Sequence, residues 1–258
     1  MELKKQESDV RALKIIAWNI QKPSKNRANE QFRWIYDRNP DVVVLTEVTL
    51  SEGFVLLKTE LEMQGYEVIY SECESYFTVI AIKNYIYYHK YVNMVYSPER
   101  VSYVEIQSPL GVISIIGVYA PTCSRDQDKI DLKKRFHEKL YKEVSENIWD
   151  RNSDTKIIVL GDLNFLEPNH KPVYNEFYKY YKYYRQFSEN PFKDLYRVMN
   201  PEALEYSWSG QGLFQRLDHV FVTDNILPFI NKVEYLHEPR KSKLSDHSAL
   251  YIELNINT

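Results

Sequence analysis

The segment at residues 157–164, Ile-Ile-Val-Leu-Gly-Asp-Leu-Asn, most constrains what this chain can fold into. Its unbroken apolar run predicts a strand buried on both faces, as in a sheet covered by helices. Gly161 permits a sharp turn, and Asp162 and Asn164 follow at the carboxyl end of the strand, where open sheets of this kind place ligands. The same residues are also typical of an ordinary strand-ending turn, in which Asp and Asn hydrogen-bond their own backbone. The rest of the chain is needed to decide between the two interpretations.

Strand and helix patterns are mixed in both halves of the chain. Apolar, β-branched and aromatic runs predict strands, and apolar residues at helical spacing predict helices. The strands are expected at residues 13–18, 41–45, 67–70, 77–82, 101–106, 112–119, 157–160, 206–209, 216–223 and 247–256, with a hairpin or edge strand at 85–91. The helices are expected at residues 30–37, 52–63, 127–149 and 174–187. This order predicts an α/β (α+β) fold of two packed sheets flanked by helices.

The composition is that of a soluble globular protein, with 44% hydrophobic and 27% charged residues among 258. No linker interrupts the pattern, so we expect a polar N-terminal extension at residues 1–12 and a single domain at residues 13–258. The charged N-terminus lacks the apolar middle of a secretory signal, and no run approaches the roughly 18 apolar residues of a membrane span. Cys73 and Cys123 are too few for a disulfide framework or a zinc cluster. We therefore expect a cytoplasmic monomer.

Acids and amides follow the apolar strands at several places. Each one alone is explained by the need of a strand to end in something polar. Together they predict one carboxylate-rich pocket, provided that the strands converge, and such a pocket is tolerable only with a cation in it. Oxygen ligands without a Cys or His cluster indicate Mg²⁺, with Mn²⁺ as an alternative. These strand ends are Asn19, Glu47, Tyr119, Asp162 with Asn164, Asp218, and Asp246 with His247.

His247 is the best placed of the histidines to act on a substrate. Asp218 could fix the tautomer of its ring, as the acid does in a catalytic triad. A hydrogen-bonded structural histidine at the start of a strand is the alternative.

Motifs at these positions occur in an order that is specific. They are Trp-Asn-Ile at residues 18–20, Thr-Glu-Val at 46–48, Gly-Val-Tyr-Ala-Pro at 117–121, Gly-Asp-Leu-Asn at 161–164, Arg-Leu-Asp-His-Val-Phe-Val at 216–222 and Ser-Asp-His at 245–247. The series resembles that of the endonuclease/exonuclease/phosphatase family, which includes the exonuclease III type enzymes. The resemblance extends from residue 13 to about residue 254. It implies a four-layer αββα sandwich, with two mixed sheets inside and helices outside, and the site at one edge.

The resemblance also implies Mg²⁺-dependent hydrolysis of a phosphoester. By this resemblance Glu47 would hold the metal ion, with Asn19 and Asp246 close to it. In-line attack on a phosphodiester needs an oriented water, charge relief on the phosphate oxygens and a cation near the leaving group. The residues carried over from the family match these three needs.

The same carry-over assigns the remaining strand ends. Asp162 would orient or deprotonate the attacking water, and Asn164 would hold Asp162 or the phosphate. His247, paired with Asp218, and Tyr119 would bind the phosphate oxygens.

Residues 194–197 and 206–208 also look like the segment that precedes the Arg-Leu-Asp motif in nuclease-like members, so Trp208 and Arg216 are expected to contact substrate. Two positions depart from the abasic-site nucleases of the family. Gln21 stands where they usually carry an Asp that contributes to the metal site, and Gln215 stands where many carry a Trp that lines the pocket. Metal affinity and abasic-site specificity are therefore open.

The segment at residues 174–187 most resembles a nucleic-acid surface, because tyrosines alternate with Lys and Arg. Tyr180 and Tyr184 would stack bases while the cations follow the phosphates. The alternative is an amphipathic helix whose tyrosines cover the sheet. The basic run at residues 240–243 predicts a second contact, at Lys241, although such runs are usually solvated loops.

The sequence thus predicts a Mg²⁺-dependent nuclease acting on DNA or RNA. A family member that hydrolyses an inositol phosphate or a phospholipid headgroup is the first alternative, and the net charge of −3 keeps it open. A catalytically silent binding module is less favoured, because such a module should have lost some of the acids.

Overall fold

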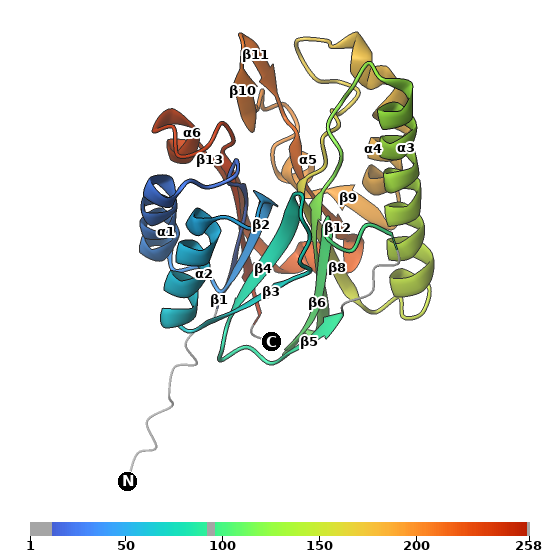
Figure 1. The fold of residues 1–258 in the computed structure, drawn as a ribbon. Coiled ribbons are helices and arrows are strands. Elements are labelled where there is room, and N and C mark those ends of the chain that lie inside the picture. Colours follow the sequence, from blue (N-terminus) through green and yellow to red (C-terminus); the bar gives the residue numbers. More distant parts are fainter. Residues whose placement is uncertain (1–11, 92–95, 257–258) are drawn as a thin grey trace.

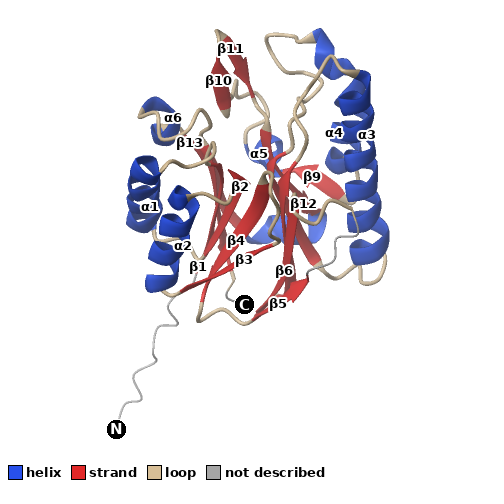
Figure 2. Cartoon of the chain, viewed as in Figure 1, coloured by secondary structure: helices blue, strands red, loops and turns tan. Residues whose placement is uncertain are grey.

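The computed structural model describes residues 12–91 and 96–256, arranged as two six-stranded sheets with helices outside (Figure 1). The first sheet has the order β13-β14-β1-β2-β4-β3 and the second β5-β6-β7-β8-β12-β9. A separate hairpin, β10-β11, projects beyond them (Figure 2). The four-layer sandwich that the sequence predicts is confirmed. Residues 1–11 of the expected N-terminal extension lie outside the described part of the chain.

The strands of the first sheet are β1 (Ala12–Asn19), β2 (Val42–Val48), β3 (Tyr66–Tyr70), β4 (Phe77–Lys83), β13 (Ile230–Leu236) and β14 (Ala249–Asn255). Those of the second are β5 (Tyr88–Tyr91), β6 (Val101–Ser108), β7 (Gly111–Tyr119), β8 (Lys156–Asp162), β9 (Phe192–Asp194) and β12 (Asp218–Thr223). The hairpin consists of β10 (Trp208–Gly210) and β11 (Leu213–Gln215).

Helices cover the outer face of each sheet (Figure 1). The first sheet is covered by α1 (Lys25–Arg38) and α2 (Glu52–Met63). The second is covered by α3 (Gln127–Lys142), its π-helical continuation (Glu143–Trp149), a 3₁₀ segment (Asn175–Tyr180) and α4 (Tyr181–Ser188). The short elements are α5 (Leu195–Met199), a 3₁₀ turn (Asp224–Phe229) and α6 (Glu238–Lys241). None of the helices in the described ranges combines the length and the apolar character needed to cross a bilayer.

Two departures from the predicted elements have local causes. Helix α1 begins at Lys25 rather than residue 30, because the Ser24 hydroxyl accepts from the Arg27 amide and caps a polar first turn. Strand β13 was not predicted, since its exposed Asn231 and Lys232 interrupt the apolar signal, although Val233 and Tyr235 are buried against β14.

Sheet register brings the predicted functional residues to one edge. The parallel pair β1–β2 places Asn19 opposite Thr46, and the parallel pair β7–β8 places Tyr119 opposite Asp162. The antiparallel pair β8–β12 then places Asp218 opposite Asp162. Because parallel strands end at the same edge, the polar residues that follow them are neighbours in space.

Candidate active site

The turn after β8 holds Asp162 in a network of hydrogen bonds. Gly161 has a φ of 129°, and a Cβ there would lie 2.3 Å from the Val118 carbonyl oxygen, so only glycine fits this passage of the chain. The Asn19 side-chain amide donates to Asp162 Oδ2 at 2.9 Å, and the Asn164 backbone amide donates to Oδ1 at 3.0 Å. Asp162 therefore hydrogen-bonds the backbone of its own turn, as in an ordinary strand-ending turn. It also contacts Asn19 of the other sheet, so its buried carboxylate joins the two sheets.

His247 and Asp218 form a buried pair beside this carboxylate. His247 Nδ1 lies 2.7 Å from Asp218 Oδ2, which leaves Nε2 directed toward Asp162 Oδ2 at 4.0 Å. The Ser207 hydroxyl accepts from the backbone amide of Asp218 at 3.0 Å. The Trp18 indole donates to the carbonyl of His247 at 3.3 Å. The backbones of both residues are thus held by distant parts of the chain, Trp18 of β1 and Ser207 just before β10.

Glu47 and Asp246 complete the acidic group. Glu47 has a φ of 56° and lies at an irregularity in β2–β4 pairing between Leu45 and Val48, so its backbone leaves the ladder. Asp246 Oδ2 accepts from the Trp208 indole at 2.8 Å, whereas Asp246 Oδ1 is buried without a hydrogen-bond partner. A buried carboxylate oxygen without a donor has the chemistry of a metal ligand.

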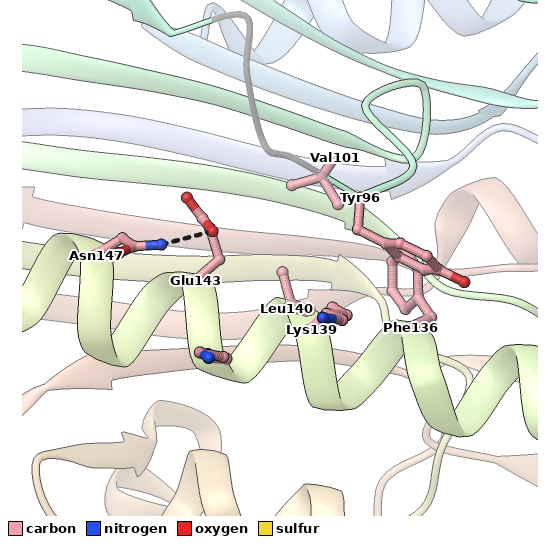
Figure 3. A pocket seen from close by; sticks show the side chains of 8 residues that line it. Tyr96, Val101, Phe136, Lys139, Leu140, Glu143 and Asn147 are labelled. Atoms are coloured by element: carbon pink, nitrogen blue, oxygen red, sulfur yellow. Dashed lines mark hydrogen bonds between the residues drawn. The ribbon is translucent and has the colours of Figure 1, made fainter.

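These side chains share one cavity of about 290 Å³. Its lining consists of Glu47, Tyr119, Thr122, Cys123, Asp162, Asn164, Phe177, Trp208, Gln215, Leu217, Asp246 and His247. Another cavity of similar volume lies between α3 and β6 (Figure 3), where Asn147 hydrogen-bonds Glu143 at 2.7 Å. Its charged lining residues are Lys139, Lys142 and Glu143, so it lacks the cluster of acids that distinguishes the cavity at the strand ends.

Burial and mutual repulsion shift the titration of these groups. Burial, with Asp218 nearby, raises the pKa of Asp162 to about 7. Burial alone would lower the pKa of His247, but the carboxylates of Asp218 and Asp162 outweigh it and raise that pKa to about 10. Burial likewise raises the pKa of Glu47 and of Tyr119. The site therefore contains more carboxylate than its own imidazolium neutralises.

Four residues that were predicted to contact substrate lie outside the lining of this cavity. The rings of Tyr180 and Tyr184 are buried under α3 and against β12, and the Tyr184 hydroxyl donates to Asp194 at 2.9 Å. The prediction that these rings stack bases is therefore wrong, and the alternative of an amphipathic helix covering the sheet is correct.

Arg216 is also fully buried, and its guanidinium pairs with Glu167 at 3.0 Å and Asp194 at 2.5 Å. The prediction that Arg216 contacts substrate is wrong, since its guanidinium donates hydrogen bonds to two buried acids, Glu167 and Asp194. Lys241 is exposed at the end of α6, outside the lining of the cavity.

Several residues of the cavity were not predicted. Thr122 and Cys123 are the two residues directly after Pro121 of the Gly-Val-Tyr-Ala-Pro motif, so the motif could have indicated their position. Phe177 and Leu217 carry no polar signal and become neighbours only through folding. Gln215 does line the cavity, whereas the side-chain oxygen of Gln21 accepts from Arg27 at 3.3 Å.

Comparisons with known proteins agree with this architecture. The Endonuclease/Exonuclease/phosphatase family profile matches residues 16–247. No curated protein sequence matches the chain. An AP endonuclease from Archaeoglobus fulgidus superposes with a TM-score of 0.76 at 19% identity, over 95% of this chain and 100% of that one. A 3′ phosphatase from Neisseria, bound to product DNA hairpin, gives 0.77 at 20% identity, over 94% and 99%. An AP endonuclease from Leishmania major gives 0.77 at 15% identity, over 95% and 88%.

Proposed function

Because the chain belongs to the endonuclease/exonuclease/phosphatase family and is a hydrolase of phosphoester bonds, we propose that it is a nuclease that cleaves phosphodiesters of DNA or RNA with a divalent cation. The observation that supports this most is the cluster at the ends of the strands. Asp162 and His247, whose ring is held by Asp218, line one cavity together with Glu47 and Asp246. A silent binding module would have no reason to keep so many buried acids together.

The donors on one side of this cavity fit a hard divalent cation. Asp246 Oδ1 is a buried oxygen without a donor, and Glu47 lines the same cavity with its pKa raised by burial. We assign these carboxylates to the ion, with the amide oxygen of Asn19 as a further candidate, although that oxygen already accepts from the Gln21 amide at 3.0 Å. Asp162, Asp218 and His247 also have metal-ligand chemistry, but His247 Nδ1 is engaged by Asp218. A bound Mg²⁺ would supply charge relief to the phosphate and the leaving oxygen.

The remaining residues divide the work of in-line hydrolysis. Asp162 accepts the proton of the attacking water, and a pKa of about 7 suits a general base at neutral pH. Asn19 and Asn164 hold the two oxygens of that carboxylate in place. His247, charged and oriented by Asp218, donates from Nε2 to a phosphate oxygen. Tyr119, kept neutral by its raised pKa, donates its hydroxyl to another.

Nucleic acid is the substrate class that the lining supports. Phe177 and Trp208 bring aromatic faces to the cavity, and such faces accept a sugar or a base. One of the structures similar to this chain was solved with product DNA. Lys241 lies at the exposed end of α6, five residues before Asp246, and we propose that it contacts the phosphate backbone of a longer nucleic-acid strand.

A substrate panel tests the proposal. Purified protein with Mg²⁺ or Mn²⁺ is incubated with single-stranded DNA, abasic duplex DNA, RNA, an inositol polyphosphate and a choline phospholipid. We expect metal-dependent cleavage of at least one nucleic acid and none without the ion. Cleavage of the inositol or lipid substrate alone would replace nucleic acid as the substrate class, and no cleavage with either ion would refute the proposed activity.

A further inference from the structure

Lys133 is a buried cation behind the cavity, on the inner face of α3. Its side chain has no exposed surface. Its ammonium donates to the carbonyl oxygen of Asn164 and lies 3.1 Å from Cys123 Sγ. The ring of Tyr180 lies on another side, with its centroid 4.4 Å from the nitrogen. Within the described residues, no carboxylate lies within 4.0 Å of this ammonium.

A buried ammonium without an ion-pair partner is costly to fold. Water is excluded, and a carbonyl, a thiol and a ring face replace only part of the lost hydration. A methionine of similar length would fill the same space among the apolar and aromatic side chains of this layer without that cost. Stability alone therefore gives no reason for a lysine at this position.

The hydrogen bond to Asn164 explains why a lysine is present, because several hydrogen bonds fix the conformation of Asn164. Asn164 adopts a left-handed conformation with a φ of 53°, which is unfavourable for a residue with a Cβ. Its backbone amide donates to Asp162 Oδ1 at 3.0 Å, and its side-chain amide donates to the carbonyl of Ala120 at 2.9 Å. The Lys133 ammonium donates to the remaining backbone group, the carbonyl oxygen, to which the Cys123 thiol also donates a longer hydrogen bond of 3.9 Å.

We propose that Lys133 is a positioning residue for phosphoester hydrolysis: it clamps the Asn164 carbonyl and so fixes the amide that orients Asp162. This inference rests on Asp162 acting as proposed above. The lysine is not part of the cavity lining; it contacts two residues that are, Cys123 and Asn164. Its effect should therefore fall on turnover and not on substrate affinity.

The test compares Lys133→Met with Lys134→Met. Lys134 is the next residue of α3, half-exposed, and pairs with Asp131 at 3.8 Å. We expect Lys133→Met to lower kcat by about tenfold or more with KM within about twofold, while its Tm stays at or above that of the wild type. Lys134→Met should match the wild type. Lys133→Arg, which keeps the charge and a donor, should recover part of the lost kcat.

A second readout does not depend on activity. Backbone hydrogen exchange over residues 161–166, followed by mass spectrometry, should be faster in Lys133→Met than in the wild type, because the Asn164 turn loses its clamp. A wild-type kcat and unchanged exchange in folded Lys133→Met would overturn the inference. So would failure of both Lys133→Met and Lys133→Gln to fold, which would make the lysine a structural requirement. An inactive wild type refutes the proposed function instead, and the exchange result then decides on the clamp alone.

Discussion

At the scale of single residues, the roles of Asp162 and His247 follow from what each can still donate or accept. Both oxygens of Asp162 already accept hydrogen bonds, from Asn19 and Asn164, yet its carboxylate remains part of the cavity lining. Asp162→Asn keeps the size of the side chain and removes the proposed base. His247→Gln keeps a donor for Asp218 and removes the imidazolium that is proposed to contact the phosphate.

We expect each of these substitutions to lower kcat at least about 100-fold. The free energy of unfolding should fall by no more than about 3 kcal/mol, because Asp162→Asn leaves one of the two donors to Asp162 unpaired and His247→Gln keeps a hydrogen-bonding group. Steady-state kinetics and urea denaturation measure the two quantities. Asp154→Asn, at an exposed loop position, is the control and should behave as the wild type. Turnover within tenfold of wild type in both variants would contradict the assigned roles.

The residues of this cluster were predictable because each lies at or next to the start or end of an apolar strand, and such boundaries are visible in the sequence. The burial of Tyr180, Tyr184 and Arg216 could not be predicted from the sequence. A helix with tyrosines on several faces does not reveal which face meets the sheet, and Tyr is suited to both surfaces. Arg216 looks like a substrate ligand until Glu167 and Asp194, distant in sequence, are seen to pair with it.

At the scale of the elements, the parallel pair β7–β8 determines the position of the turn that carries Asp162 and Asn164. Gly161 passes so close to β7 that a Cβ would meet the Val118 carbonyl oxygen at 2.3 Å. Gly161→Ala should therefore cost roughly 3 kcal/mol of unfolding free energy, from the clash together with the left-handed backbone. Urea denaturation checks this value.

Gly111→Ala provides the matched control for that measurement. Gly111 also has a positive φ, of 93°, but a Cβ there would meet nothing within 4 Å. Gly111→Ala should therefore lower the free energy of unfolding by only about 1 kcal/mol, which is the cost of the strained backbone. Equal losses in the two variants would show that the close approach of β7 and β8 is unimportant.

The long strands and helices were predicted to within a few residues because their apolar periodicity is strong. Short or irregular elements were not. The expected strand at residues 206–209 forms part of the β10–β11 hairpin, and the expected helix at residues 174–187 begins as a 3₁₀ segment. The left-handed Glu47 in β2 has no sequence signal either, since a Glu at that position also fits an ordinary strand.

At the scale of the whole molecule, the two sheets bring their acids together at one edge, so charge repulsion there opposes folding. Glu47 in β2 and Asp246 just before β14 belong to the first sheet, and Asp162 in β8 and Asp218 in β12 belong to the second. A divalent cation that binds only the folded chain offsets this repulsion and adds its own binding free energy. Stability should therefore depend on the ion, even without substrate.

We expect saturating Mg²⁺ to raise the Tm of EDTA-treated protein by about 5 to 10 °C. The estimate takes about 2.7 kcal/mol at a ligand concentration of 100 Kd and about 2 to 4 °C per kcal/mol for a chain of this size. Glu47→Gln should lose most of the increase, because a neutral amide is a weaker ligand for a hard cation. Glu74→Gln, an exposed control, should keep it. Differential scanning calorimetry with and without Mg²⁺ distinguishes the two variants. A full increase of Tm in Glu47→Gln would show that other residues bind the ion. No increase of Tm in the wild type would show that the folded protein tolerates these acids without a cation.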